Sequence, residues 1–95
     1  NGRNQLTHTE VLFEGTLTSS VVYPREIIRL AVTENAAAVL VGHNHPSGNK
    51  KESLEDRKIT DKIKVALKTV DINFHDHIIV VPGGGYTSFA DKGLM

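Results

Sequence analysis

The segment that decides the fold is residues 36–48, which read AAAVLVGHNHPSG. Its first six residues are continuously apolar, and a strand without polar alternation is buried on both faces, like the central strands of layered α/β folds. Residues 42–48 contain the turn formers Gly, Asn, Pro and Ser, so we expect the strand to end in a loop there. Ligands of open α/β sheets bind where such strands end. The segment therefore predicts a buried central strand with a site at its carboxyl end.

The residues on both sides of this segment predict alternating strands and helices. Apolar and β-branched residues gather in four stretches that we expect to be strands: residues 5–13, 16–22, 72–81 and 86–89. A helix is expected from Pro24 to near Asn35, because proline is favoured at the first helical position. Together with a second helix that begins at Ser53, this order predicts an α/β (α+β) fold in which helices flank one mixed β-sheet.

The second helix has a recognisable start and an apolar face. Ser53 and Asp56 have the spacing of a capping box, with Asp where Glu or Gln is usual. The expected apolar stripe consists of Ile59, Ile63, Ala66 and Val70. Asp56 falls on the same stripe, because successive helical residues are rotated by about 100°. A carboxylate on a buried face is costly unless it is paired or binds a cation.

Two histidines and this aspartate have the pattern of metal ligands. His43 and His45 lie two residues apart, so in extended backbone both side chains point to the same side. Pro46 biases His45 towards that conformation, since the residue before a proline is disfavoured in the helical region. Three protein ligands, two nitrogens and one oxygen, leave a fourth position open to water. That is the pattern of a catalytic zinc site.

Each of these residues also has an ordinary structural interpretation. His-x-His pairs occur in strands and loops that bind no metal. Asp56 would be favoured at a helix start by the helix dipole alone, and Ser53 would be an N-cap alone. The residue pattern by itself leaves the metal site and the structural interpretation both open.

Length and composition indicate one small globular domain. The chain has 95 residues, 39% of them hydrophobic and 23% charged, and eleven basic residues balance eleven acidic ones. The absence of cysteine excludes disulfides and thiolate metal ligands and fits a reducing, cytoplasmic compartment. No apolar run approaches the roughly 20 residues of a membrane span, so no membrane association is expected. Neutral net charge and 5% aromatic residues argue against direct nucleic-acid binding.

The beginning of the chain predicts that part of the domain lies upstream. Asn1-Gly2 is a strong signal for a two-residue hairpin turn, but only the arm after it is present. We therefore expect residues 1–95 to form a single domain that lacks its first strand and helix. The sheet edge left exposed suggests a homo-oligomer in which two copies pair.

The spaced motif resembles that of a known class of metalloproteins. His43-x-His45-Pro46 followed by Ser53-x-x-Asp56 is similar to the JAMM (MPN-plus) metalloprotease motif. More narrowly, four segments resemble the RadC family of bacterial JAB-domain proteins: HNHPSG at 43–48, PRE at 24–26, FEGT at 13–16 and DHIIV at 76–80. The resemblance covers nearly the whole chain and implies a cytidine-deaminase-like JAB/MPN domain.

This resemblance implies a zinc-dependent metallopeptidase or isopeptidase-like hydrolase. In such an enzyme, zinc-activated water attacks an amide carbonyl of a protein or peptide substrate. His43, His45 and Asp56 match the zinc ligands, and Ser53 matches the serine that helps to stabilise the oxyanion. The resemblance places the family's base glutamate on a strand upstream of Asn1.

Several residues near the motif have less certain roles. Glu10 and Glu14 are the early glutamates of the chain, and Glu10 is either the base or an ordinary strand residue. Asp76 and His77 either support the metal ligands from behind or alternate across a sheet edge. The cations near the motif form a solvated face or steer an acidic substrate: Lys50, Lys51, Arg57 and Lys58.

His75 and His77 form a second His-x-His pair, but no third ligand follows at a matching spacing. Residues 83–85 (GGG) indicate a turn.

Two other interpretations of the chain assign it to a different functional class. A non-catalytic JAB-fold interaction module would keep the fold without turnover. The family's historical label also suggests a DNA-repair-associated protein.

Overall fold

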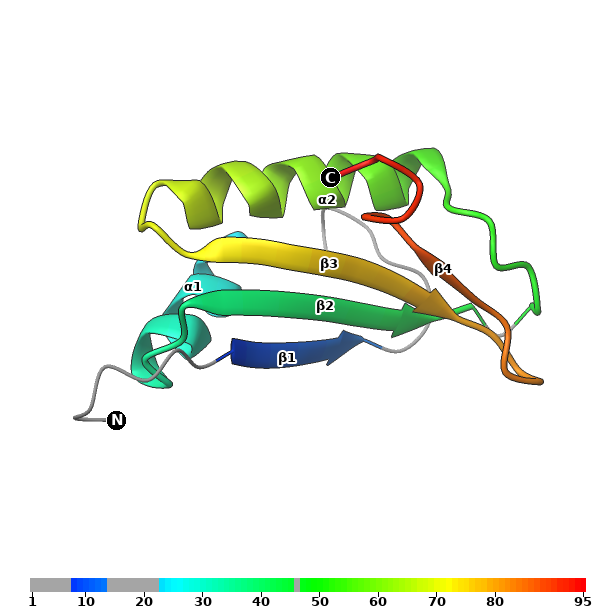
Figure 1. The fold of residues 1–95 in the computed structure, drawn as a ribbon, viewed down its shortest axis with the longest axis horizontal. Helices are drawn as coiled ribbons and strands as arrows, with labels where there is room; N and C mark the ends of the chain where they lie inside the picture. Colours follow the sequence, from blue (N-terminus) through cyan, green and yellow to red (C-terminus); the bar gives the residue numbers. More distant parts are fainter. Residues whose placement is uncertain (1–7, 14–22, 46) are drawn as a thin grey trace.

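The computed structural model describes residues 8–13, 23–45 and 47–95. These residues form, in chain order, β1 (His8–Phe13), α1 (Pro24–Thr33), β2 (Ala38–Asn44), α2 (Leu54–Lys68), β3 (Asn73–Val80) and β4 (Tyr86–Ser88) (Figure 1). The strand expected over residues 16–22, together with Glu14 and Pro46, lies outside the described residues.

The strands form one mixed sheet in the order β1-β2-β3-β4. The first three strands are parallel, and β4 is antiparallel to β3. The carboxyl ends of the parallel strands therefore meet at one end of the sheet, where His43 pairs with Phe13 of β1 and Ile79 of β3. The predicted α+β architecture with a mixed sheet is confirmed.

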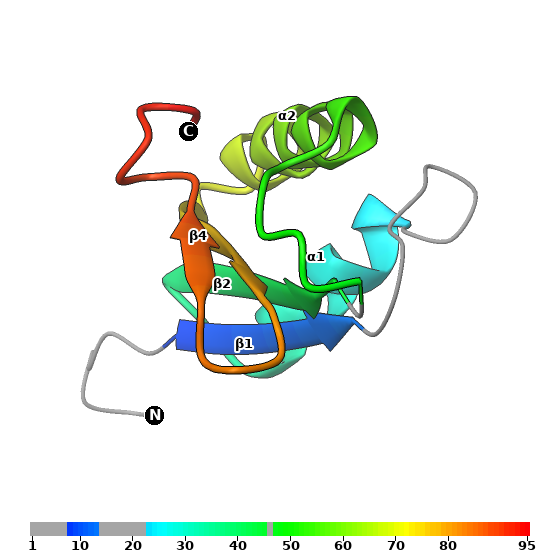
Figure 2. The same cartoon turned by 90° about the vertical axis from the view of Figure 1, so that its right-hand side faces the viewer.

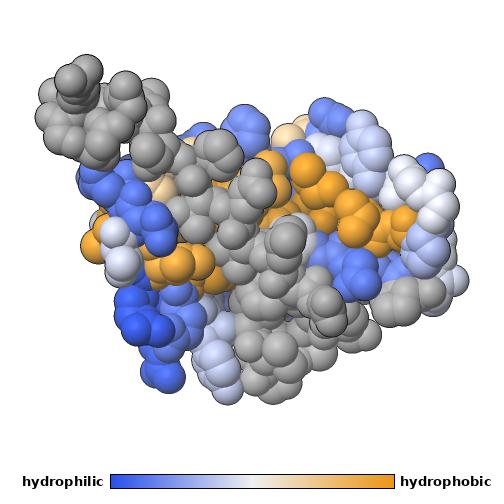
Figure 3. Space-filling view, turned by 90° about the horizontal axis from the view of Figure 1, so that it is seen from below, coloured by the Kyte–Doolittle hydropathy of each residue, from blue (hydrophilic) through white to orange (hydrophobic). Residues whose placement is uncertain are grey.

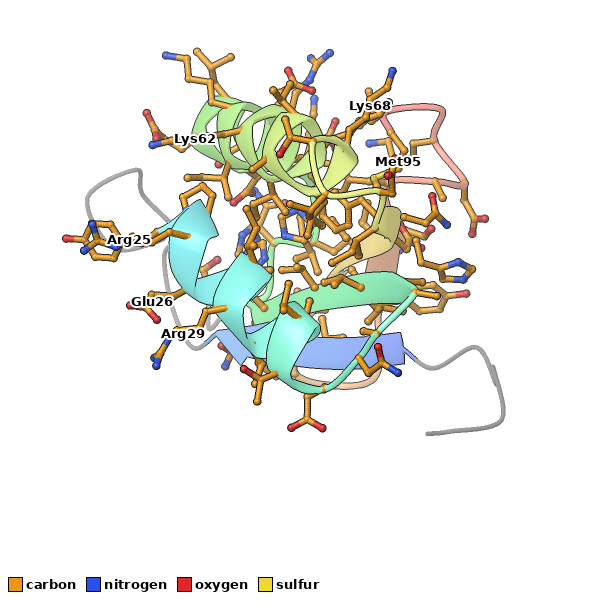
Figure 4. All side chains as sticks on the ribbon, turned by 90° about the vertical axis from the view of Figure 1, so that its left-hand side faces the viewer. Arg25, Glu26, Arg29, Lys62, Lys68 and Met95 are labelled. Carbon is orange, nitrogen blue, oxygen red and sulfur yellow. The ribbon has the colours of Figure 1, made fainter. Side chains whose placement is uncertain are left out.

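Both helices cover the same face of this sheet. They contact each other and lie on one side of the strands (Figure 2). Charged side chains project outward from the helices, among them Lys62 and the Arg29–Glu26 pair at 3.0 Å (Figure 4). The core between helices and sheet consists of Ile27, Ala31, Val39, Val41, Ile59, Ile63, Leu67, Ile72 and Phe74.

The central strand differs from the prediction in two ways. β2 continues to Asn44, so His43 belongs to the strand and not to the loop expected from Gly42 onward. Its two faces also differ, because Val39 and Val41 are fully buried whereas Ala38 and Leu40 are half-buried. Because the two described helices cover one face of the sheet, full burial is limited to the alternate residues of β2 that point to that face.

The helix α2 begins as predicted and ends earlier than predicted. Ser53 is the N-cap, and both hydrogen bonds of the capping box with Asp56 are present. The buried stripe continues from Ile63 to Leu67, one helical turn further on, and not to Val70, which is 41% exposed. Val70 lies beyond the last helical residue and so leaves the helix face.

A register shift in β3 decides which side chains reach the helix-covered face. Val39 pairs with Phe74, whereas the next residue, Leu40, pairs with Asp76, so His75 is an extra residue in β3. An inserted residue turns the following side chains to the opposite face. His77 thereby pairs with Val41 and lies on the same face as the core residues of β2.

The remaining described features are a turn and an edge. Gly83 and Gly84 have φ of 91° and 93° in the turn between β3 and β4, as the glycine run predicts. β1 is at one edge of the sheet formed by the described strands, and Figure 3 faces that side, where hydrophobic surface lies between hydrophilic residues. Neither described helix is long and apolar enough to cross a membrane.

Candidate metal centre

Three side chains converge where β2 ends and α2 begins. Nε2 of His43 lies 3.3 Å from Oδ1 of Asp56, and Nε2 of His45 lies 3.3 Å from Oδ2 of the same carboxylate. The two Nε2 atoms are 2.8 Å apart. His43 and Asp56 are buried, whereas the side chain of His45 is 17% exposed. The three residues predicted as ligands are thus brought together from a strand, a loop and a helix.

Two of the three distances between these atoms match those expected around a tetrahedral metal ion. Ligand atoms about 2.0–2.1 Å from a tetrahedral zinc lie roughly 3.3 Å from one another. The two nitrogen–oxygen distances, one to each oxygen of Asp56, match this value, whereas the two Nε2 atoms are closer together at 2.8 Å. One ligand atom from each residue lies within 4.8 Å of the other two. The group His43, His45 and Asp56 could therefore hold a metal ion, with a further position on the side of the partly exposed His45.

The carboxylate of Asp56 serves the helix and the site at once. Its Oδ2 accepts the backbone N–H of Ser53 at 2.7 Å, and its own N–H donates to Ser53 Oγ at 3.0 Å. A carboxylate at this third helical position is held by the capping box while it faces both histidines. These contacts explain why Asp56, a polar residue on the apolar stripe of α2, is buried.

The tautomer of His45 is set by the loop that follows it. Nδ1 of His45 lies 2.8 Å from the backbone carbonyl oxygen of Asn49. A carbonyl oxygen can only accept, so Nδ1 carries the hydrogen and the neutral ring keeps its lone pair on Nε2. That lone pair is the one that faces Asp56, as a metal ligand requires.

Contacts from the end of the chain hold this loop in place. The backbone N–H of His45 donates to the carbonyl of Val80 at 2.9 Å, and Thr87 Oγ1 donates to the carbonyl of Lys50 at 2.6 Å. Lys92 forms an ion pair with Glu52. Residues of β3, β4 and the segment after β4 thus fix the distance between His45 and the start of α2.

A chain of hydrogen bonds lies behind His43. Its Nδ1 is 2.8 Å from Nε2 of His77, and Nδ1 of His77 is 2.6 Å from Oγ1 of Thr60. Thr60 Oγ1 donates to the backbone carbonyl of Asp56 at 2.8 Å. Sequence reasoning missed Thr60, although a polar residue one turn after Asp56 on a buried face was a usable signal.

Asp76 and His77 occupy different surroundings. The carboxylate of Asp76 accepts hydrogen bonds from Ser88 Oγ at 2.5 Å and from two backbone N–H groups, those of His77 and Ala90. It therefore holds the turn after β4. Phe89 in that turn stacks on the His77 ring at 4.5 Å. His77 contacts the candidate ligand His43 directly, whereas Asp76 holds the turn whose Phe89 packs on His77. The exposed His75 is not part of the cluster.

Burial keeps the inner histidines neutral. Removal from water lowers the pKa of His77 to about 4, and the neighbouring His43 acts in the same direction. Burial also lowers the pKa of His43, against the opposing effect of the Asp56 carboxylate. Neutral imidazole is the form of histidine that binds a metal ion.

An open cleft of about 360 Å³ borders the cluster. It is lined by polar residues of the loop and the helix start: His45, Ser47, Asn49, Lys51, Glu52, Ser53 and Asp56. Ser53 lies in this lining and accepts a hydrogen bond from Asp56, so its own hydroxyl hydrogen can donate into the cleft. A ligand in the cleft would meet Ser53 and the outer side of the cluster together.

The fold and the cluster define a JAB-type domain with a candidate metal site. A family model for the RadC-like JAB domain matches residues 1–94, and the chain belongs to this family. It is 50% identical to a UPF0758 protein of Pseudoalteromonas translucida, over 97 residues that cover all of this chain and 42% of that protein. It is 48% identical to a UPF0758 protein of Chromobacterium violaceum, with the same coverage. The resemblance to RadC proteins is confirmed, and the chain spans less than half the length of these relatives.

Proposed function

We propose that this domain is the zinc-binding part of a hydrolase that cleaves amide or isopeptide bonds in proteins or peptides. The observation that carries the proposal is the convergence of two histidine Nε2 atoms and one carboxylate beside a cleft. Zinc bound there would lower the pKa of a bound water to about 7 and polarise the substrate carbonyl. Two nitrogens and one oxygen are a common ligand set of catalytic zinc.

The residues of this chain would contribute in separate ways. His43 and His45 supply neutral nitrogen ligands, and the buried Asp56 supplies a negative charge that balances part of the charge of the cation. Ser53 donates its hydroxyl hydrogen to the carbonyl oxygen as negative charge develops there. The cleft beside His45 receives the substrate chain. Lys51 in its lining favours acidic segments, since the neighbouring Glu52 is already paired with Lys92.

The general base in this proposal is a glutamate outside the described residues. Glu10 pairs in register with Leu40, not with a residue next to the cluster, so the register of β1 gives no support to Glu10 as the base. The family resemblance assigns the base to a strand upstream of Asn1. Hydrolysis is therefore proposed for the longer protein, and metal binding for this domain.

The proposal is tested by hydrolysis assays on the full-length protein. Removal of metal by a chelator should abolish cleavage of peptide or isopeptide substrates, and added zinc should restore it. His45→Ala should abolish cleavage, and added zinc should not restore it. The control His75→Ala, at an exposed histidine of β3, should keep the activity. Zinc binding without cleavage of any substrate would favour the alternative, a JAB-fold interaction module.

A further inference from the structure

The hydrogen-bond chain behind His43 has only one consistent direction. The backbone carbonyl of Asp56 can only accept, so Thr60 Oγ1 donates its single hydrogen to it. Thr60 Oγ1 can then only accept from His77, which places the hydrogen of the neutral His77 ring on Nδ1. Nε2 of His77 is left with a lone pair.

The same logic continues to the candidate ligand. Because Nε2 of His77 can only accept, Nδ1 of His43 carries the hydrogen of this contact at 2.8 Å. The neutral His43 ring then has its lone pair on Nε2, which faces Asp56 and His45. An acceptor in the first turn of α2 thus sets the tautomer of a strand histidine through two intermediate side chains.

Buried neighbours surround these hydrogen-bonded side chains. His77 and Thr60 are fully buried, and the register shift at His75 is what turns His77 towards His43. Phe89 stacks on the His77 ring with an interplanar angle of 22°. No water is needed to complete the chain, since each of its polar atoms already has a partner among the described residues.

We infer that His77 and Thr60 are positioning residues that set the tautomer of His43 and tie it to the backbone of Asp56, so that both ligands are presented to the metal together. This role rests on the proposed metal site. Partners behind metal ligands fix ring orientation, and their loss typically lowers metal affinity by about 10–100-fold.

The first test measures Co²⁺ binding by the full-length protein, from the visible absorption of the bound ion. His77→Leu and Thr60→Val remove hydrogen bonds and should raise the Kd for Co²⁺ by about 10–100-fold. His77→Gln and Thr60→Ser keep an acceptor or a hydroxyl and should bind close to the wild type. His45→Ala provides the background from other metal-binding groups.

A packing control separates hydrogen bonding from stability. Ile63→Val alters the same buried layer but removes none of these hydrogen bonds. It should therefore lower the Tm of the metal-free protein and leave the Kd for Co²⁺ unchanged. Equal losses of affinity in His77→Leu and His77→Gln would overturn the role. So would full affinity in His77→Leu. Absence of Co²⁺ binding by the wild type would instead overturn the metal site on which the role depends.

The second test observes the tautomers directly. Long-range ¹H–¹⁵N spectra of the metal-free protein should show the hydrogen on Nδ1 in both His43 and His77. In Thr60→Val the His77 ring should lose this single tautomer. A His77 ring with its hydrogen on Nε2 would mean that these hydrogen bonds run in the opposite direction. That result would overturn the inference, whatever the metal affinity.

Discussion

Replacement of Ser53 by alanine separates the stability of α2 from the integrity of the metal site. The change removes the acceptor of the Asp56 N–H at 3.0 Å. It leaves the other bond of the capping box intact, because the backbone N–H of residue 53 still donates to Asp56 Oδ2. We therefore expect the helix start to weaken while the carboxylate keeps its orientation towards His43 and His45.

The size of the effect follows from the exposure of the site. Loss of a serine N-cap typically costs about 1 kcal/mol, and water can partly replace the hydroxyl because Ser53 is exposed. For a domain of this size, 1 kcal/mol corresponds to a decrease in Tm of roughly 4–8 °C. Zinc content should stay at the wild-type level, since no ligand atom is lost.

Two assays on Ser53→Ala measure these effects, thermal unfolding followed by circular dichroism and zinc content by elemental analysis. Ser47→Ala is the matched control, because Ser47 lines the same cleft but caps no helix. In the full-length protein, kcat should also decrease by up to roughly 10²-fold if Ser53 donates to the oxyanion. An unchanged Tm would refute the capping argument, and loss of zinc would refute the division of roles within Asp56.

Two further predictions concern the buried residues of the core. Burial lowers the pKa of His77 from 6.5 to about 4, so the unfolded protein binds more protons than the folded protein between these pH values. The free energy of unfolding of the metal-free protein should therefore decrease as the pH falls from 6.5 to 4. His77→Gln should reduce this pH dependence, measured by urea unfolding at several pH values. Leu67→Ala should cost about 2–5 kcal/mol in the same unfolding assay, because the side chain is fully buried. Val65→Ala on the exposed face should have little effect, and equal losses would show that the buried face of α2 is wrongly assigned.

The candidate ligands could be predicted because their signals are local. His43 and His45 are two residues apart, and the start of α2 is written in Ser53 and Asp56. A capping box needs only four consecutive residues, and the periodicity of α2 places Asp56 on the buried face. Both the histidine pair and the start of α2 can therefore be predicted from short stretches of the sequence.

The support behind the ligands depends on pairing between distant segments, which local patterns do not encode. His77 reaches His43 because the register between β2 and β3 shifts after Val39, and simple alternation along β3 would turn it away. Asn49 contributes a backbone carbonyl, which any residue could supply. Phe89 reaches His77 only because β4 pairs with β3.

The central claim is tested most directly by the zinc content of the purified protein after dialysis. We predict one zinc per chain in the wild type and in His75→Ala, and none above background in His45→Ala. Circular dichroism should show that all three proteins are folded, so that loss of zinc reports on the ligand. A wild-type protein without zinc, or His45→Ala with full zinc occupancy, would contradict the assignment of His43, His45 and Asp56 as the metal site.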